Sequence, residues 1–254
     1  MALLLLKLGL TPALIGLATI ASRRWGPGVG GLLVALPLTS GPVLLLLALD
    51  HGPAFAARAT EGSLAGATAV MAFCLAYAWA GRRLVWWAAL AAGYFGFAAM
   101  SIAMQPVVAG SLVVLVIVAL GAPLVGLRLL PARGPAPEET PAPWWDLPAR
   151  MTMGAALVLA ITGFSAVIGP QVSGLLATIP VFITVLAVFT HRREGPARTV
   201  LLLRGALIGM FGTIAFVIVL RFVLEPGGIA IAFSVATVVA LAIQAVGLRV
   251  VRRA

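Results

Sequence analysis

Two prolines interrupt an apolar run in the first part of the chain, and two hydroxyl side chains lie between them. Pro37 and Pro42 are five residues apart, and the residues between them include Thr39, Ser40 and Gly41. Proline has no backbone N–H and bends a helix, so it leaves backbone carbonyl groups without their usual partners. The hydroxyls could bind a ligand at such a break, and a half-helix that begins there favours a negatively charged group. The alternative is a kinked helix whose own hydroxyls satisfy these backbone groups.

A later apolar run carries a similar break. Pro180 interrupts this run as Pro37 interrupts the first, and Thr178 precedes Pro180 by two positions. The later run lacks a second proline, so the predicted pair of breaks is asymmetric. Broken backbone at membrane depth persists only where it is buried or lines a cavity. We therefore predict a substrate-binding site between the two runs, built from both prolines and the neighbouring hydroxyls.

Two arginines lie inside the apolar run near residues 199–222, the eighth of the nine runs described below. Arg204 is near the inner end of the run, where it could contact a substrate or extend its side chain to the membrane surface. Arg221 is near the outer end, and we expect it to reach the surface and pair with Glu225, four residues later. Glu61 could form a charge pair with Arg204 or take part in coupling.

The remaining residues that could carry chemistry are few. Asp50 and His51 end an apolar run and could move protons, although a solvated helix end is the favoured interpretation. Cys74 is the only cysteine and His191 the only other histidine, so we expect neither a disulfide framework nor a metal site. The chain also lacks paired carboxylates and a nucleophile beside a base. We therefore expect neither an enzyme nor a bound cofactor.

The composition places these residues in a membrane. Hydrophobic residues make up 62% of the 254 residues, charged residues make up only 9%, and the mean hydropathy is +1.15. A soluble domain carries roughly 25% charged residues to cover its surface. The net charge of +10 does not indicate nucleic acid binding, because the arginines lie in pairs between apolar runs. They are better explained as topology signals, with anionic lipid headgroups as secondary partners.

Several apolar runs are long enough, at about 20 residues, to cross a hydrocarbon core of ~30 Å as helices. The nine runs lie near residues 2–22, 29–49, 60–80, 84–104, 107–127, 151–168, 172–190, 199–222 and 228–248. One helix over 84–127 would be about 66 Å long, so the chain is predicted to reverse at Gln105-Pro106. The predicted fold class is therefore an all-α, polytopic membrane bundle of about nine transmembrane helices.

The arginines also predict an orientation. With the N-terminus outside, thirteen arginines lie in the inner segments and only Arg58 lies in an outer loop. This is the distribution that the positive-inside rule describes. The first run has no basic segment before it, so we expect a retained helix rather than a signal peptide. The predicted location is the bacterial cytoplasmic (inner) membrane, with the C-terminus in the cytoplasm.

The chain aligns with itself, without gaps, at one constant offset. This self-alignment places Gly26-Pro27 over Gly169-Pro170, Gly52-Pro53 over Gly195-Pro196, and Glu61-Gly62 over Arg204-Gly205. The predicted organisation is a first four-helix repeat (1–104), a linker helix with a proline-rich cytoplasmic loop (105–150) and a second four-helix repeat (151–254). A single linker helix inverts the second repeat. Inverted repeats are typical of secondary transporters, whose site lies near the midplane.

The second repeat resembles a known family. Residues 173–182, followed by Glu194-Gly195 and by the run that contains Arg204-Gly205, look like the small four-helix GlpM-type inner-membrane proteins. The whole chain would then resemble two such units fused through one helix, an architecture that is also similar to that of drug/metabolite transporters. The GlpM-type resemblance implies a link to exopolysaccharide production. The chain lacks the mid-helix glutamate of small multidrug exporters, which argues against proton-driven drug export.

These features predict a transporter or flippase that works by alternating access. Its substrate would be a small or lipid-linked molecule that could be anionic. The residues expected to bind it are Pro37, Thr39, Ser40, Gly41, Thr178, Pro180 and Arg204. The alternative is a non-catalytic membrane subunit that supports the assembly of cell-envelope polysaccharide or lipid. Its partners would then be envelope-biosynthesis proteins as well as membrane lipids.

Overall fold

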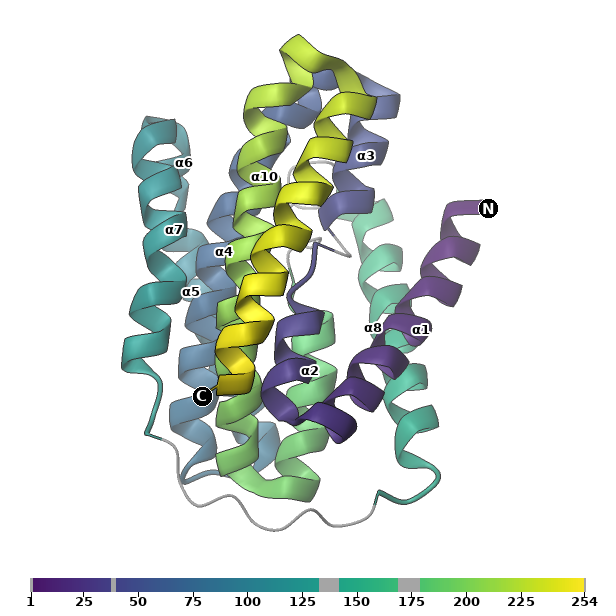
Figure 1. Cartoon of the computed structure of the whole chain (residues 1–254), viewed down its shortest axis with the longest axis vertical. Coiled ribbons are helices and arrows are strands. Elements are labelled where there is room, and N and C mark those ends of the chain that lie inside the picture. Colours follow the sequence, from purple (N-terminus) through teal and green to yellow (C-terminus); the bar gives the residue numbers. More distant parts are fainter. Residues whose placement is uncertain (1, 38–39, 133–141, 169–178, 254) are drawn as a thin grey trace.

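The computed structural model describes residues 2–37, 40–132, 142–168 and 179–253, and this part of the chain is α-helical without a β-strand (Figure 1). The helices are α1 (Ala2–Trp25), α2 (Pro27–Val34), α3 (Ser40–His51), α4 (Pro53–Gly81), α5 (Trp86–Ala103), α6 (Gln105–Gly110), α7 (Leu112–Leu129), α8 (Asp146–Ile168) and α10 (Val181–Arg253). The predicted all-α fold is confirmed.

Glycine interrupts α10 twice. Gly195 (φ 83°, ψ 177°) and Gly228 (φ 73°, ψ 171°) have backbone conformations that are not helical. Residues with a Cβ atom rarely adopt such angles, so glycine is required at both positions. α10 therefore consists of three segments, 181–194, 196–227 and 229–253, and Figure 1 shows the chain reversing direction at both glycines.

Several helices are built to cross a membrane. Within the described residues, four stretches are long and apolar enough: α4, the continuous stretch Trp86–Gly110 formed by α5 and α6, α7, and α10. Large apolar side chains cover their outer surfaces, where Phe95 on α5 is 77% exposed and Ile117 on α7 is 64% exposed. An apolar surface of this kind is suited to lipid rather than to water. The chain is therefore a membrane protein.

The chain does not reverse at Gln105-Pro106, so that prediction is wrong by about five residues. Met104 keeps helical dihedral angles (φ −81°, ψ −13°), and its carbonyl accepts a hydrogen bond from the Val108 amide at 3.0 Å. Pro106 lies in the first turn of α6, where a helix tolerates a proline. The reversal comes at Ser111, whose extended backbone follows α6 and whose hydroxyl accepts a hydrogen bond from the Val114 amide at 3.5 Å.

α2 packs on the second segment of α10 with almost no space between the backbones. A Cβ atom on Gly205 would overlap the carbonyl oxygen of Gly28. A Cβ atom on Gly31 would in turn overlap the carbonyl oxygen of Leu202. Membrane helices approach this closely only through small residues. This contact fixes α2, and with it the chain break that follows, against α10.

The remaining helices surround this pair. α4 packs against α3, α5 and α10, whereas α7 packs against α4 and α10. α1 and α8 lie side by side and form one flank of the bundle (Figure 1). The core between these helices is apolar, so the polar groups within it are candidates for function.

Candidate functional site

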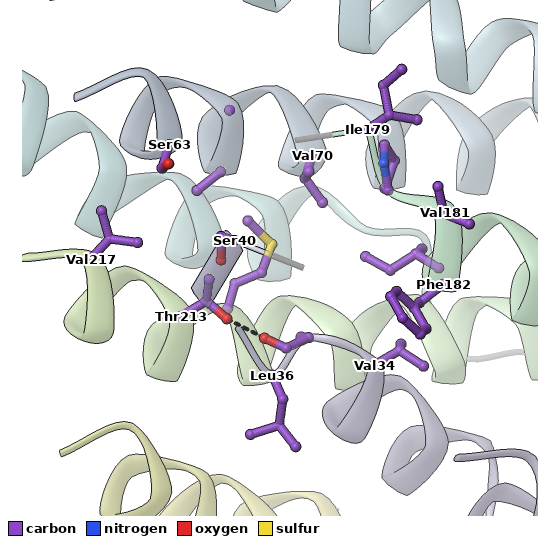
Figure 2. Close-up of a pocket in the computed structure, with 16 residues that line it drawn as sticks. Val34, Leu36, Ser40, Ser63, Val70, Ile179, Val181, Phe182, Thr213 and Val217 are labelled. Atoms are coloured by element: carbon purple, nitrogen blue, oxygen red, sulfur yellow. Dashed lines mark hydrogen bonds between the residues drawn. The ribbon is translucent and has the colours of Figure 1, made fainter. Parts of the chain in front are cut away.

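A cavity of about 90 Å³ lies at the break between α2 and α3. Four parts of the chain line it, namely residues 34–36 and Ser40 beside the break, residues between 63 and 70 on α4, 179–183 at the start of α10, and residues between 210 and 217 in its second segment (Figure 2). Ser40, from the first predicted break, and Pro180, from the second, thus lie at the same cavity although they are far apart in the sequence.

The first break follows from Pro37. α2 ends at Val34, and Pro37 has no N–H with which to continue the helical hydrogen-bond pattern. The Pro37 carbonyl accepts a hydrogen bond from the Gly41 amide at 2.9 Å, and this bond begins α3. Ser40 is the first residue of α3 and lines the cavity. The positive end of the α3 dipole therefore lies at the cavity.

The second break brings another helix end to the same place. α10 begins at Val181, and the Thr184 amide donates a hydrogen bond to the Pro180 carbonyl at 2.8 Å. Pro180 and Val181 both line the cavity. The first amide groups of a helix have no partners within it and carry a partial positive charge. The cavity therefore lies beside the positive ends of two helices, α3 and α10.

Three hydroxyl side chains give the cavity its polar character. Ser40 comes from α3, Ser63 from α4 and Thr213 from the second segment of α10 (Figure 2). Thr213 Oγ1 donates a hydrogen bond to the Ala35 carbonyl, which lies at the end of α2. The other described residues that line the cavity are apolar or lack a side-chain charge. A ligand would thus meet hydroxyls and helix ends rather than a fixed countercharge.

The predicted site residues around the two breaks do not all reach the cavity. Pro37 and Gly41 lie in the first break but are not among the residues that line it. A Cβ atom on Gly41 would lie 3.4 Å from the Phe216 ring, so this glycine faces α10. Thr39 and Thr178 lie outside the described residues, and their part in the site stays a prediction.

Arg204 is not among the residues that line the cavity. Its Nη1 donates a hydrogen bond to the carbonyl of Leu127 at 3.4 Å, in the last turn of α7. The last carbonyl groups of a helix have no helical partners, and an arginine beside them stabilises the negative end of the helix. Arg204 thus connects α10 to the end of α7, and its predicted contact with a substrate stays a prediction.

Glu61 pairs with Arg221 rather than with Arg204. Arg221 Nε lies 3.2 Å from Glu61 Oε1, and Arg221 Nη1 lies 4.0 Å from Glu225 Oε1. Arg221 therefore contacts its predicted partner, Glu225, at a longer distance than it contacts Glu61. The Glu61–Arg221 pair joins α4 to the second segment of α10 within about one turn of the residues that line the cavity on both helices.

Asp50 and His51 lie away from the cavity, at the exposed C-terminal end of α3. The chain turns directly after them at Gly52, whose φ of 89° favours glycine. The His51 ring stacks on the Phe55 ring across this turn, with 4.9 Å between the ring centroids. This arrangement is typical of a solvated helix end.

Asp146 is the centre of a buried ion cluster that the sequence did not predict. Its Oδ2 lies 2.6 Å from Arg23 Nη2 and 2.9 Å from Arg150 Nε, and its Oδ1 lies 3.2 Å from Arg193 Nη1. Asp146 is fully buried and Arg150 is nearly so. The cluster joins the end of α1, the start of α8 and the end of the first segment of α10.

The charge of Asp146 is stabilised by its neighbours. Burial by itself would raise the pKa of the carboxyl, because burial disfavours the charged form. The charge of Arg150, hydrogen bonds from Arg23 and Arg150, and the charge of Arg193 outweigh burial, and the pKa of Asp146 lies below its ordinary value.

The range 105–150 is predicted to end in a loop, but its last five residues begin α8. The sequence signal for this helix start was Asp146, an acid four residues before Arg150.

Within the part of the chain that the structure describes, no three His, Cys, Asp or Glu side chains come together in a way that could hold a metal ion.

Comparisons with known proteins do not identify a family for this chain. The resemblance to GlpM-type proteins stays a prediction. No family model, curated protein or solved structure matches this chain.

Proposed function

We propose that the protein is a transporter or flippase of the bacterial inner membrane that moves a small or lipid-linked molecule by alternating access. The observation that carries this proposal is the cavity at which two helices, α3 and α10, begin inside the bundle. Interrupted helices whose ends meet within the membrane are typical of secondary transporters, where the helix ends bind the substrate.

The positions of helices and turns support the inverted repeat that this mechanism needs. The self-alignment of the chain places α1 over residues 145–168, which contain the described part of α8. It also places Gly52 over Gly195, and their backbones are alike, with φ 89° and ψ 165° at the first and φ 83° and ψ 177° at the second. In Figure 1, α1 and α8 run in opposite directions. These correspondences favour two repeats of opposite orientation.

The lining of the cavity favours a substrate that accepts hydrogen bonds. The hydroxyls of Ser40, Ser63 and Thr213 can donate, and the ends of α3 and α10 add partial positive charge. A negatively charged or strongly polar group would be stabilised by these dipoles. Because dipoles hold a charge less tightly than a buried arginine, the substrate could also leave again, as transport requires.

The Glu61–Arg221 pair is suited to close one end of the cavity. On both α4 and α10, the pair lies beyond the lining residues in the direction of Gly52 and Gly228, which end these two stretches. In the other direction, the first segment of α10 continues for ten residues, about 15 Å, from Ile183 to the ion cluster at Asp146. The Glu61–Arg221 pair would therefore part when the cavity opens toward the nearer face.

Solute flux in proteoliposomes tests the proposed function. A thermal-shift screen of the purified protein against small carboxylates and phosphate esters selects the solute, whose radiolabelled form is then used for uptake. Ser40→Ala and Ser63→Ala should each lower uptake about tenfold, the effect of losing one hydrogen bond of ~1.4 kcal/mol to a charged group.

The matched control is Thr152→Val. The Thr152 hydroxyl bonds only to carbonyl groups of its own helix, α8, among its described contacts, so this variant should keep wild-type uptake. Uptake that is unchanged in both serine variants would overturn the site. Absence of uptake for every stabilising solute would overturn the function.

The alternative is a non-catalytic membrane subunit that supports the assembly of envelope polysaccharide or lipid. The small volume of the cavity favours it, since pockets for small molecules commonly reach ~300–1,000 Å³. Labelling of Ser40→Cys in a Cys74→Ala background separates the two functions, because Cys74 is the only native cysteine. A transporter exposes this position to each side of the membrane in turn, whereas a scaffold does not.

A further inference from the structure

A groove of about 450 Å³ lies where α4 ends, separate from the cavity. Trp79, Arg82 and Arg83 line it, and all three are exposed, Trp79 to 52%. Trp79 Nε1 donates a hydrogen bond to the Leu129 carbonyl, at the end of α7, at 2.9 Å. This bond fixes the indole between the ends of α4 and α7, so one wall of the groove is held in place.

Two arginines line the rest of this groove. Arg82 Cζ lies 5.4 Å from the centre of the Trp79 ring, a cation–π distance. Stacking on a ring leaves the N–H donors at the edge of the guanidinium available. Arg83, the next residue in the chain, lines the same groove and adds a second positive charge to it. Within the described residues neither arginine forms an ion pair. Asp50 lies at the end of α3, and the other described acids pair with other arginines, namely Asp146, Glu194, Glu61 and Glu225.

We propose that this groove binds the headgroup of an anionic phospholipid, with the phosphate between Arg82 and Arg83. Guanidinium groups match phosphate oxygens in geometry and charge, and tryptophan prefers the level of the headgroups. The next two residues, Leu84 and Val85, are 50% and 54% exposed. Two positively charged side chains thus line the groove, and exposed apolar residues follow them directly in the chain, a combination that fits a lipid better than a soluble anion.

The charge of the surrounding surface also favours an anionic lipid. At the same end of the bundle, Arg24 and Arg252 lie 5.5 and 5.7 Å from the centre of the Trp25 ring, and Arg192 lies 5.2 Å from that of Trp86. Clustered arginines at one membrane face attract negatively charged headgroups. The groove at Trp79 gives this general attraction a defined place. This inference does not depend on whether the protein transports a solute.

The test is the melting temperature of the purified protein in neutral detergent, titrated with phosphatidylglycerol, phosphatidylcholine or inorganic phosphate. Only phosphatidylglycerol should raise it in a saturable way. The double variant Arg82→Gln/Arg83→Gln should raise the half-saturating phosphatidylglycerol concentration about tenfold, because both charged donors are lost. Arg82→Lys/Arg83→Lys keeps the charge but loses the paired donors, so an increase of about threefold is expected.

The matched control removes two charges from the same end of the molecule. Arg249→Gln/Arg252→Gln changes exposed residues at the end of α10 and should leave the half-saturating concentration unchanged. Glu138→Gln/Glu139→Gln should also leave the half-saturating phosphatidylglycerol concentration unchanged, because Arg82 and Arg83 are proposed to bind lipid and not these two acids. Equal losses in the two arginine-to-glutamine variants would show a general charge effect and overturn the proposal. An equal response to inorganic phosphate would overturn the assignment to a lipid.

Discussion

At the scale of single residues, one carboxylate pairs with three guanidinium groups at the end of the bundle. Asp146 has no exposed surface and lies within 3.2 Å of Arg23, Arg150 and Arg193. A buried charge is tolerated only when it is paired, and removal of one partner leaves the others without compensation. Without Asp146, the three arginines would repel one another where α1, α8 and α10 meet.

We expect Asp146→Asn to lower the free energy of unfolding by about 3 kcal/mol, because buried Arg150 would lose its partner. The folded-state pKa of Asp146 lies below its ordinary value of ~3.9, so the stabilisation is present above that value and lost as the pH falls through the lower one. Melting curves at pH 7 and at acid pH measure both effects, and the variant should lack the acid-induced loss that this group causes.

Glu194→Gln is the control for this variant. It breaks the partly buried Glu194–Arg198 pair, whose atoms are 3.5 Å apart, and should cost less than about 1 kcal/mol. Equal costs for the two variants would contradict the central role of Asp146 in the cluster.

Residue types predict helix breaks better than they predict partners. The positions of Ser40 and Pro180 at breaks could be predicted, because proline removes a backbone donor in any surroundings. The partners of Arg204 and Glu61 could not. Arg204 bonds to a carbonyl 77 residues away, and Glu61 pairs with an arginine 160 residues away. No local rule of spacing connects groups so distant in the sequence.

At the scale of helices, the contact between α2 and α10 is made by backbone rather than by side chains. Gly205→Ala should force the two helices apart, because the new Cβ atom would overlap the Gly28 carbonyl oxygen. Overpacking of this kind costs about 1–3 kcal/mol. Unfolding in sodium dodecyl sulfate measures the loss.

Gly121→Ala is the matched control, since no atom lies within 4 Å of the position that its Cβ would take on α7. Alanine favours a helix over glycine by up to about 1 kcal/mol, so this variant should be as stable as the wild type or more stable. A loss in Gly121→Ala equal to that in Gly205→Ala would show that the effect comes from glycine in general and not from this contact.

The existence of the helices could be predicted more reliably than their ends. Pro106 was expected to end a helix, but a proline in the first turn of α6 leaves the path of the chain unchanged. The signal for the reversal was Gly110-Ser111, in which the serine hydroxyl caps α7. Similarly, the proline-rich stretch before Asp146 obscured the start of α8.

At the scale of the whole molecule, composition and glycine positions could predict an all-α membrane protein, whereas the packing of its helices could not be predicted. An apolar surface of this extent needs lipid whatever the arrangement of the helices. Which helices enclose the cavity depends instead on contacts such as that of Gly31 with the Leu202 carbonyl, which join distant parts of the chain.

Closure of the cavity by the Glu61–Arg221 pair predicts a change in accessibility. In a Cys74→Ala/Ser40→Cys background, Glu61→Gln should speed labelling by an impermeant maleimide about threefold, from the face opposite the Asp146 cluster. A partly exposed ion pair is worth ~0.2–1 kcal/mol, which sets this modest size. The charge exchange Glu61→Arg/Arg221→Glu should restore the slow rate, and Glu194→Gln should not change it. An unchanged rate in Glu61→Gln would contradict the closure.

The cluster around Asp146 also constrains the order in which the protein is assembled. Arg23 is synthesised well before Asp146, and Arg193 is synthesised after it. Until then, α1 and α8 have only part of the charge set that holds them in the finished bundle. α1 therefore gains the full set of charges that attaches it to the bundle only after the first segment of α10 has been synthesised.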